Sequence, residues 1–358
     1  MRPQIAVVIL TVVFLTTAAH AQVTPNIAAQ LRELGPSVCV PETAKIYKPL
    51  LLDKPPYKGI TVVRNISYLP DPRTVMDVFA PEKGGGKRPV LIYIPGGNGD
   101  KLHPPPDGDA FYDNIMVWAV KNGMVGVNMQ RRGGLNGGGL AWDQPAKDVG
   151  VVVDWVRKNI VRYKGNPDRI FLWAHSAGNG PASTYVGHPE IMGANADAIK
   201  GVILMSAPNF NIAPETPSAP GRGAPPAAGP NAANARAPVG ICGRPAAEAR
   251  GGRGPGDGAR GAGAGRGAAP VDEATLLARS NLPGLAKGKT AVFLGWGEID
   301  PPNILAFDDA LKNALCKVGR CPTAVFFKDH SHMSLVFSPN TPDKSVTDPI
   351  LKWMKSIK

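Results

Sequence analysis

The feature that most constrains this chain is a serine set between very small residues at the end of a buried-type strand. Residues 169–173 read Arg-Ile-Phe-Leu-Trp, and residues 174–178, Ala-His-Ser-Ala-Gly, follow at once. A serine with Ala174 and Gly178 two positions away fits a strand-to-helix turn that is too sharp for larger neighbours and strains the serine backbone. The pattern predicts that Ser176 Oγ projects above a sheet edge beside a helix N-terminus, as in a nucleophile elbow.

Segments on both sides of this turn alternate between strand and helix patterns. Two β-branched, alternating stretches come first and predict an antiparallel hairpin or meander. Continuous apolar runs typical of strands buried on both faces follow, interleaved with helical patterns. The expected strands lie at 60–68, 74–80, 90–94, 124–129, 170–174, 201–206, 290–295 and 323–328, and the expected helices at 109–121, 144–163, 271–280, 301–315 and 347–357. This order predicts an α/β fold with a mostly parallel central sheet and helices on both faces, the layout of an α/β-hydrolase domain.

The first 21 residues have the pattern of a secretory signal peptide. Arg2 precedes an uncharged apolar stretch over 5–15, and Ala19-His20-Ala21 supplies a small-x-small cleavage site. The apolar stretch is short of the roughly 20 residues that a membrane span needs. We therefore expect cleavage near Ala21, export to the periplasm or the extracellular space, and no stable membrane anchor.

Composition divides the rest of the chain into four parts. A short N-terminal segment covers 22–57, and the hydrolase domain covers 58–213 and 271–358. Between its two parts, residues 214–270 are almost entirely Gly, Pro, Ala and Arg, which predicts a disordered insertion. The formal net charge of +12 is partly carried by this insertion, and the remainder forms no basic stripe. Because the insertion lacks interleaved aromatic residues and the chain is expected to be exported, no nucleic-acid partner is expected.

Export makes disulfides possible among the four cysteines. Cys316 and Cys321 enclose only four residues, a spacing that suits a small loop closed by a disulfide. Cys39 and Cys242 could also pair, but Cys242 lies in the low-complexity tract and the sequence leaves that pairing open. No cysteine or histidine spacing typical of a metal site is present, so we expect neither a metal nor another cofactor.

A serine nucleophile needs a histidine base and a carboxylate that orients it. In this layout the chain order is serine, acid, histidine, each after the carboxyl end of a strand. The loop after 290–295 offers Glu298 and Asp300, and the loop after 323–328 offers His330 and His332. Alternating residues there would face the same way, so spacing alone separates neither pair.

The reaction also needs backbone N–H groups that stabilise an oxyanion. One is expected from Ala177, directly after the serine at the start of a helix, where the helix dipole favours an anion. Others are expected from the turn Pro95-Gly96-Gly97-Asn98-Gly99 that follows the strand at 90–94.

Four segments together resemble the carboxylesterases of the α/β-hydrolase superfamily. They are Tyr93–Gly99, Asp168–Gly178, Gly297–Asp300 and His330–Ser334. The resemblance is greatest to the hormone-sensitive-lipase-like and feruloyl-esterase-like branches, which also include kynurenine formamidases, and it covers about 58–356 apart from the low-complexity tract. It implies that Ser176 is the nucleophile, Asp300 the acid and His332 the base, with Gly96, Gly97 and Ala177 as oxyanion donors.

The chain departs from the pattern of these families at three positions. Pro95 replaces the family histidine at the oxyanion turn, Asn98 replaces its third glycine, and Ala174 replaces the first glycine of the elbow.

These observations predict a secreted serine hydrolase that cleaves a small-molecule carboxylic ester through an acyl-enzyme. An amidase or peptidase with the same triad is one alternative, and a non-catalytic binding protein on a hydrolase scaffold is another. The sequence sets neither the acyl and alcohol specificity nor the oligomeric state.

Overall fold

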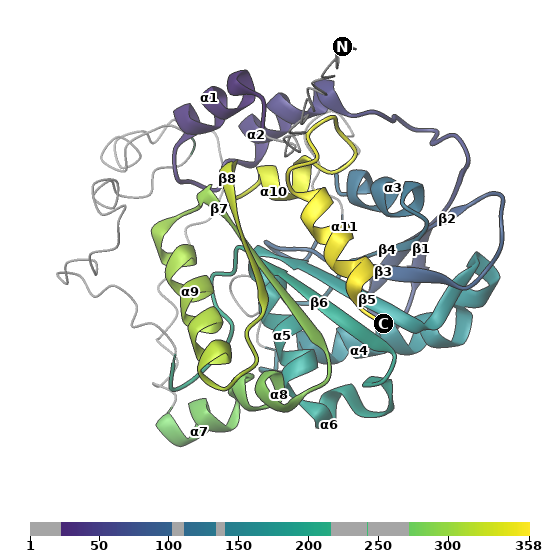
Figure 1. The fold of residues 1–358 in the computed structure, drawn as a ribbon. Coiled ribbons are helices and arrows are strands. Elements are labelled where there is room, and N and C mark those ends of the chain that lie inside the picture. Colours follow the sequence, from purple (N-terminus) through teal and green to yellow (C-terminus); the bar gives the residue numbers. More distant parts are fainter. Residues whose placement is uncertain (1–22, 102–110, 134–139, 216–241, 243–271) are drawn as a thin grey trace, which may run out of the picture.

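A computed structural model describes residues 23–101, 111–133, 140–215, 242 and 272–358. Within these residues the strands form one sheet in the order β1-β2-β4-β3-β5-β6-β7-β8 (Figure 1). The strands are β1 (Ile60–Ser67), β2 (Val75–Pro81), β3 (Arg88–Ile94), β4 (Val125–Met129), β5 (Gly165–His175), β6 (Ile199–Met205), β7 (Ala291–Ile299) and β8 (Thr323–Ser331). β2 is antiparallel to β1 and to β4, and the other neighbouring pairs are parallel. The expected mostly parallel sheet is therefore confirmed.

Helices cover both faces of the sheet. They are α1 (Pro25–Leu34), α2 (Val40–Tyr47), α3 (Asp113–Lys121), α4 (Gln144–Asn159), α5 (Asn179–Gly187), α6 (Pro189–Met192), α7 (Glu273–Ala278), α8 (Leu282–Lys287), α9 (Pro302–Lys317), α10 (Ser334–Phe337) and α11 (Thr347–Ser356). Buried residues of α1, α2, α3 and α11 form one core, and those of α4, α5, α8 and α9 form the other. In Figure 1, α11 crosses in front of the sheet while α5 lies behind it.

The continuous apolar runs divide between these two cores. Along β5, Phe171 and Trp173 point into the first core, whereas Leu172 and Ala174 point into the second. Successive side chains of a strand point to opposite faces, so a strand covered on both sides must be apolar at every position. Truncating a fully buried aromatic such as Trp173 typically costs about 3–5 kcal/mol, so these strands hold the sheet edge rigidly in place.

Several helix ends follow from their sequence. α4 has Pro145 in its first turn, where its missing N–H costs nothing. α3 is capped at its C-terminal end by Asn122, and Gly123 follows with a φ of 82°. At the start of α7, the Asp272 carboxylate accepts a hydrogen bond of 2.8 Å from the Thr275 N–H.

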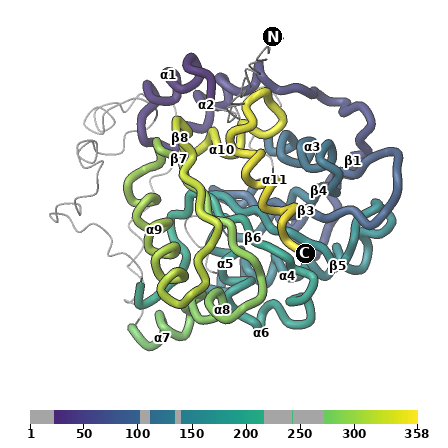
Figure 2. Tube along the Cα trace, in the orientation of Figure 1, coloured from purple at the N-terminus to yellow at the C-terminus, as the bar shows by residue number. Residues whose placement is uncertain are grey.

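The N-terminal segment contains two helices that the sequence analysis left unassigned. α1 packs against β8, and α2 packs against α10, beside the ends of β7 and β8 (Figure 2). Arg32 of α1 forms ion pairs with Glu298 of β7 and Asp329 of β8. This segment therefore supports the part of the sheet that carries the expected acid and histidine loops.

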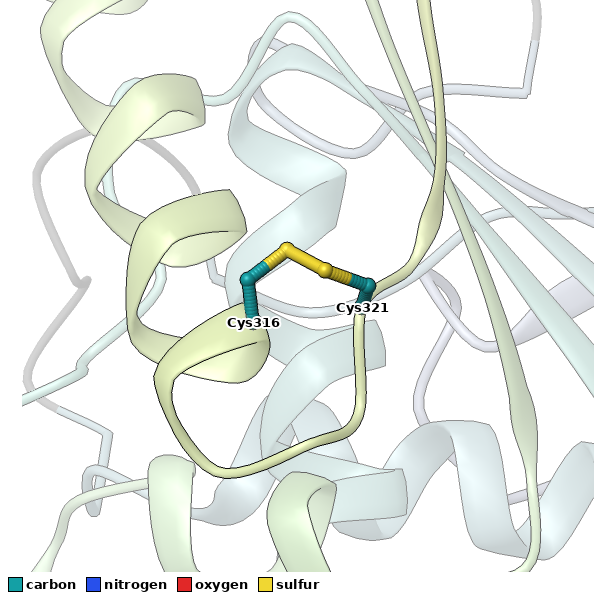
Figure 3. Close-up of a disulfide and its surroundings, with 2 residues drawn as sticks. All are labelled: Cys316 and Cys321. Atoms are coloured by element: carbon teal, nitrogen blue, oxygen red, sulfur yellow. A yellow bond between two sulfur atoms is a disulfide. The ribbon is translucent and has the colours of Figure 1, made fainter.

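The expected disulfide between Cys316 and Cys321 is confirmed. It joins the end of α9 to the chain just before β8 (Figure 3). The expected signal peptide and nearly all of the expected insertion at 214–270 lie outside the described residues. Among the helices that are described, none has the length and apolar character to cross a membrane.

Candidate active site

The turn after β5 has the backbone geometry that its sequence predicts. Ser176 has a φ of 53°, a left-handed value that is costly for a residue with a side chain. A Cβ at Gly178 would lie 2.3 Å from the Ile94 carbonyl oxygen, so glycine is required there. The strained serine thus stands at the carboxyl end of β5, directly before α5.

Asn179 holds this turn against the neighbouring strand. Its amide nitrogen donates to the carbonyl oxygens of Ser176, at 2.8 Å, and of Met205, at 2.7 Å. Its amide oxygen accepts from the Met205 N–H at 2.9 Å. Asn179 is fully buried, and these bonds offset part of the strain at Ser176. A role for Asn179 was not predicted, although an amide side chain directly after a small-x-Ser-x-Gly turn is a readable signal.

The glycine turn after β3 lies against the serine. A Cβ at Gly96 would be 2.7 Å from Ser176 Cβ and 3.4 Å from Ser176 Oγ, so only a bare backbone fits there. Gly97 has a φ of 52°, and the Gly99 N–H closes the turn by donating to the Gly96 carbonyl at 2.9 Å. The structure therefore brings the expected oxyanion turn and the serine together.

Asp300 and His332 form a buried pair at the ends of β7 and β8. His332 Nδ1 and Asp300 Oδ1 are 2.8 Å apart, and both side chains are almost completely inaccessible to solvent. His332 Nε2 is buried and has no hydrogen-bond partner among the described residues. The imidazole is oriented by a carboxylate on one side and has its second nitrogen available on the other.

Further hydrogen bonds fix the Asp300 carboxylate. Its Oδ2 accepts from Ser206 Oγ at 2.5 Å and from the Gly297 N–H at 2.7 Å. Ser206 directly follows β6 and has a φ of 50°, a second strained serine at the same sheet edge. The sequence predicted nothing for Ser206, because only its contact with Asp300 distinguishes it from other serines.

Glu298, the other candidate acid, faces elsewhere. It is the penultimate residue of β7, and its Oε2 accepts from the Asp329 N–H at 2.9 Å and from Arg32. The two carboxylates of this loop therefore have different partners, which spacing alone did not separate.

The two loop histidines also diverge, so the expectation that they face the same way is wrong. β8 continues to Ser331. Gly297 of β7 pairs with Phe327 of β8, and Ile299 of β7 pairs with Ser331, so three residues of β8 lie opposite the single residue Glu298. Asp329 within this bulge has a φ of 64°. His330 therefore remains in the irregular strand, whereas His332 lies beyond its end, and the simple alternation fails.

His330 is bound by hydroxyl groups on both ring nitrogens. Nδ1 lies 2.8 Å from Ser334 Oγ, and Nε2 lies 2.6 Å from Ser345 Oγ. Asp343 is more distant, at 3.8 Å from Nε2, and Tyr47 of α2 donates to it. Complete burial lowers the pKa of His330, with the nearby carboxylates acting in the opposite direction.

His175, the residue before the serine, contacts the backbone of His332. Its Nε2 lies 2.9 Å from the His332 carbonyl oxygen, and the two ring centroids are 4.5 Å apart. A carbonyl can only accept, so His175 carries its proton on Nε2. This bond links the elbow directly to the segment that bears His332.

A buried carboxyl group lies behind the acid. Asp308 of α9 is inaccessible to solvent, and neither of its oxygens has a hydrogen-bond partner among the described residues. Burial raises the pKa of Asp308 well above its ordinary value, and the negative charge of Asp300 adds to this increase.

Sheet order, elbow and loop placement together define an α/β-hydrolase. Residues 75–217 match the model of the carboxylesterase family. The chain thus has the α/β-hydrolase fold, and residues 75–217 are similar to the carboxylesterase family.

Curated relatives match over part of their length. Secreted lipase 5 of Gibberella zeae is 32% identical over 155 residues, which are 36% of this chain and 28% of the lipase. Cocaine esterase of Homo sapiens is 33% identical over 130 residues, which are 34% of this chain and 22% of the esterase. The matched segments therefore span less than a third of these relatives.

Solved structures share the fold over nearly the whole chain. An esterase from Rhizomucor miehei has a TM-score of 0.59 at 15% identity, with 94% of this chain and 98% of the other covered. A bacterial heroin esterase has a TM-score of 0.58 at 17% identity, with the same shares covered. At these identities the likeness establishes the fold alone.

Proposed function

We propose that this protein is a serine hydrolase that cleaves carboxylic esters through an acyl-enzyme. The observation that carries the proposal is the buried pair of His332 and Asp300. One imidazole nitrogen is fixed by a carboxylate at 2.8 Å, and the other is free of partners among the described residues. This is the arrangement that a general base requires.

In the first half of the reaction, Ser176 Oγ attacks the ester carbonyl carbon. His332 Nε2 removes the hydroxyl proton as the new C–O bond forms, and Asp300 stabilises the resulting imidazolium at Nδ1. The negative charge that develops on the carbonyl oxygen is held by backbone N–H groups of Gly96, Gly97 and Ala177. When the tetrahedral intermediate collapses, the ester C–O bond breaks and His332 returns its proton to the departing alcohol.

The second half repeats this chemistry with water. His332 Nε2 removes a proton from a water molecule, whose oxygen attacks the acyl carbon of the Ser176 ester. The bond to Ser176 Oγ then breaks, and the serine recovers its proton from His332. The products are a carboxylic acid and an alcohol, and the enzyme is regenerated.

We also propose that the protein is exported. The pattern of residues 1–21 predicts a signal peptide. The disulfide between Cys316 and Cys321 supports export, because disulfides persist mainly in oxidising compartments.

A fluorophosphonate probe tests the nucleophile. Wild type should be labelled, and Ser176→Ala should not be labelled and should lose about 10⁴-fold or more in kcat on p-nitrophenyl esters. Ser345→Ala is a control because it removes the hydroxyl that bonds the other loop histidine, His330, and it should still be labelled. Equal labelling of wild type and Ser176→Ala would sink the proposal and favour a non-catalytic binding protein.

A substrate panel then defines the reaction. We expect turnover of p-nitrophenyl esters over a range of chain lengths and slower turnover of matched aryl amides, and feruloyl esters belong in the same panel. Faster cleavage of the amides than of the esters would reassign the protein as an amidase with the same triad.

A further inference from the structure

Two cysteines that are far apart in sequence come together at the start of α2. Positions 39 and 242 differ by 203, yet the sulfurs of Cys39 and Cys242 and a carboxylate oxygen of Glu42 all lie within 4.8 Å of one another. The other two cysteines of the chain already form a disulfide. Cys39 and Cys242 are the remaining thiols.

The surroundings of this pair disfavour charged sulfur. Cys39 is the residue before the first turn of α2 and is 1% exposed, and its Sγ lies 3.0 Å from Ser37 Oγ. Burial raises the pKa of the Cys242 thiol, and the neighbouring Cys39 and Glu42 raise it further. A thiolate beside the Glu42 carboxylate is therefore unfavourable, whereas a neutral, apolar disulfide would remove that conflict.

We propose that Cys39 and Cys242 form a second disulfide, which covalently links residue 242 to the start of α2. The sulfurs lie within 4.8 Å of each other and need to approach to the bonded distance of about 2.05 Å. The disulfide between Cys316 and Cys321 indicates an oxidising environment, which is the condition that a second disulfide needs.

The bond would form by thiol–disulfide exchange with a disulfide oxidant, such as oxidised glutathione or an oxidised disulfide oxidoreductase. The thiolate of one cysteine attacks the disulfide of the oxidant, forms a mixed disulfide and releases one thiol. The thiolate of the second cysteine then attacks the first cysteine's sulfur and releases the other thiol. Two protein thiols lose two protons and two electrons, and the oxidant is reduced to two thiols.

The proposed link has a structural consequence at the other end of α2. Tyr47, the last residue of α2, donates to Asp343, and α2 packs against α10, which follows the His332 segment. The link would hold residue 242 to a helix that contacts the base-bearing part of the domain. Because it joins residues 203 positions apart, whereas Cys316 and Cys321 are separated by 5, it would restrain the unfolded chain far more.

Peptide mapping tests the proposal without reference to ester hydrolysis. The full chain is produced by secretion into an oxidising compartment, denatured, alkylated with iodoacetamide and digested without reductant. We expect a peptide pair joined through Cys39 and Cys242, and no alkylation of either. Cys39→Ser should expose Cys242 to alkylation, and Cys242→Ser should expose Cys39.

Thermal unfolding supplies a second measurement with an internal control. The double variant Cys39→Ser with Cys242→Ser should lower Tm by about 5–10 °C, and at least about twice as much as the double variant Cys316→Ser with Cys321→Ser. Alkylation of both Cys39 and Cys242 in protein whose other disulfide is intact would overturn the proposal. So would one equivalent of zinc in the purified chain that Cys39→Ser removes, because the three groups would then be metal ligands.

Discussion

Two clusters of serine, histidine and aspartate lie next to each other in this domain, and they differ in what occupies the histidine nitrogens. His332 has a carboxylate oxygen at 2.8 Å on Nδ1 and a buried, unpartnered Nε2. His330, two residues earlier, has a serine hydroxyl on each nitrogen, and its aspartate is 3.8 Å away. The residue types are the same, but only the first cluster leaves a nitrogen available to take a proton.

The serines of the two clusters differ as well. Ser176 stands on a strained turn with a φ of 53° and has a glycine turn packed against its side chain. Ser345 sits between His330 and Asp343, and its hydroxyl donates to Asp343 at 2.5 Å. A hydroxyl that already donates to a carboxylate is not available to give its proton to a histidine base. Availability of donors and acceptors, rather than composition, therefore distinguishes the proposed catalytic cluster from its neighbour.

The largest expected effect separates the two histidines. His332→Ala should lower kcat by about 10⁴-fold or more, because the nucleophile loses its base. His330→Ala should keep most of its turnover per folded molecule but lose about 2–4 kcal/mol of stability, since it leaves a cavity and removes one hydrogen bond from each of two serine hydroxyls. Steady-state kinetics and urea unfolding on both variants provide the check. If His330→Ala were the inactive variant and His332→Ala the active one, the roles would be exchanged.

The next effect separates the two carboxylates of β7 and its following loop. Asp300→Asn should reduce kcat by roughly 10³–10⁴-fold, because an amide no longer selects the productive imidazole tautomer or stabilises the imidazolium. Glu298→Gln keeps an oxygen that can accept from the Asp329 N–H and loses only the ion pair with the half-exposed Arg32. Its kcat should stay close to that of wild type. Similar losses in the two variants, measured on one p-nitrophenyl ester, would contradict the assignment of Asp300.

The smallest effect concerns stability and pH at Asp308. Its folded pKa is raised above the ordinary value of 3.8, so between that value and the folded pKa the native state holds a proton that the unfolded state has lost. Wild type should therefore lose stability as pH rises through this window. Asp308→Asn should match wild type near pH 4 and gain a few degrees in Tm by pH 8.

Asp309 on the same helix provides the control for this measurement. It is exposed, so Asp309→Asn should leave the pH dependence of Tm unchanged. If the Tm of Asp308→Asn differed from that of wild type by the same amount at every pH, the pKa of Asp308 would not be raised by folding. Asp308 would then be ionised in the native state.

Much of the sheet was predictable from sequence, for a physical reason. Strands covered on both faces must be continuously apolar, so 90–94 and 170–174 are identified without knowledge of their neighbours. The elbow was equally readable, because the steric demand at Gly178 is local. The residues of both the serine turn and the glycine turn were therefore predicted at the positions that the structure brings together.

Other features depended on contacts that a sequence does not display. α1 buries few apolar side chains, and its Thr-Pro start and terminal Gly35 were its only signals. The divergence of His330 and His332 rests on a bulge in β8 opposite Glu298, for which nothing in the local pattern provides evidence. Ser206 acquires its role solely from Asp300, which is 94 residues away.

The asymmetry around Ser176 bears on how such turns are found. At position 178 a single added methyl group would collide with the Ile94 carbonyl, whereas at position 174 the alanine methyl is an ordinary member of the hydrophobic core beneath the sheet. A search that requires glycine on both sides of the serine would pass over this protein. A filter that accepts alanine before the serine but insists on glycine after it follows the sterics, and would recover serine turns that the stricter motif discards.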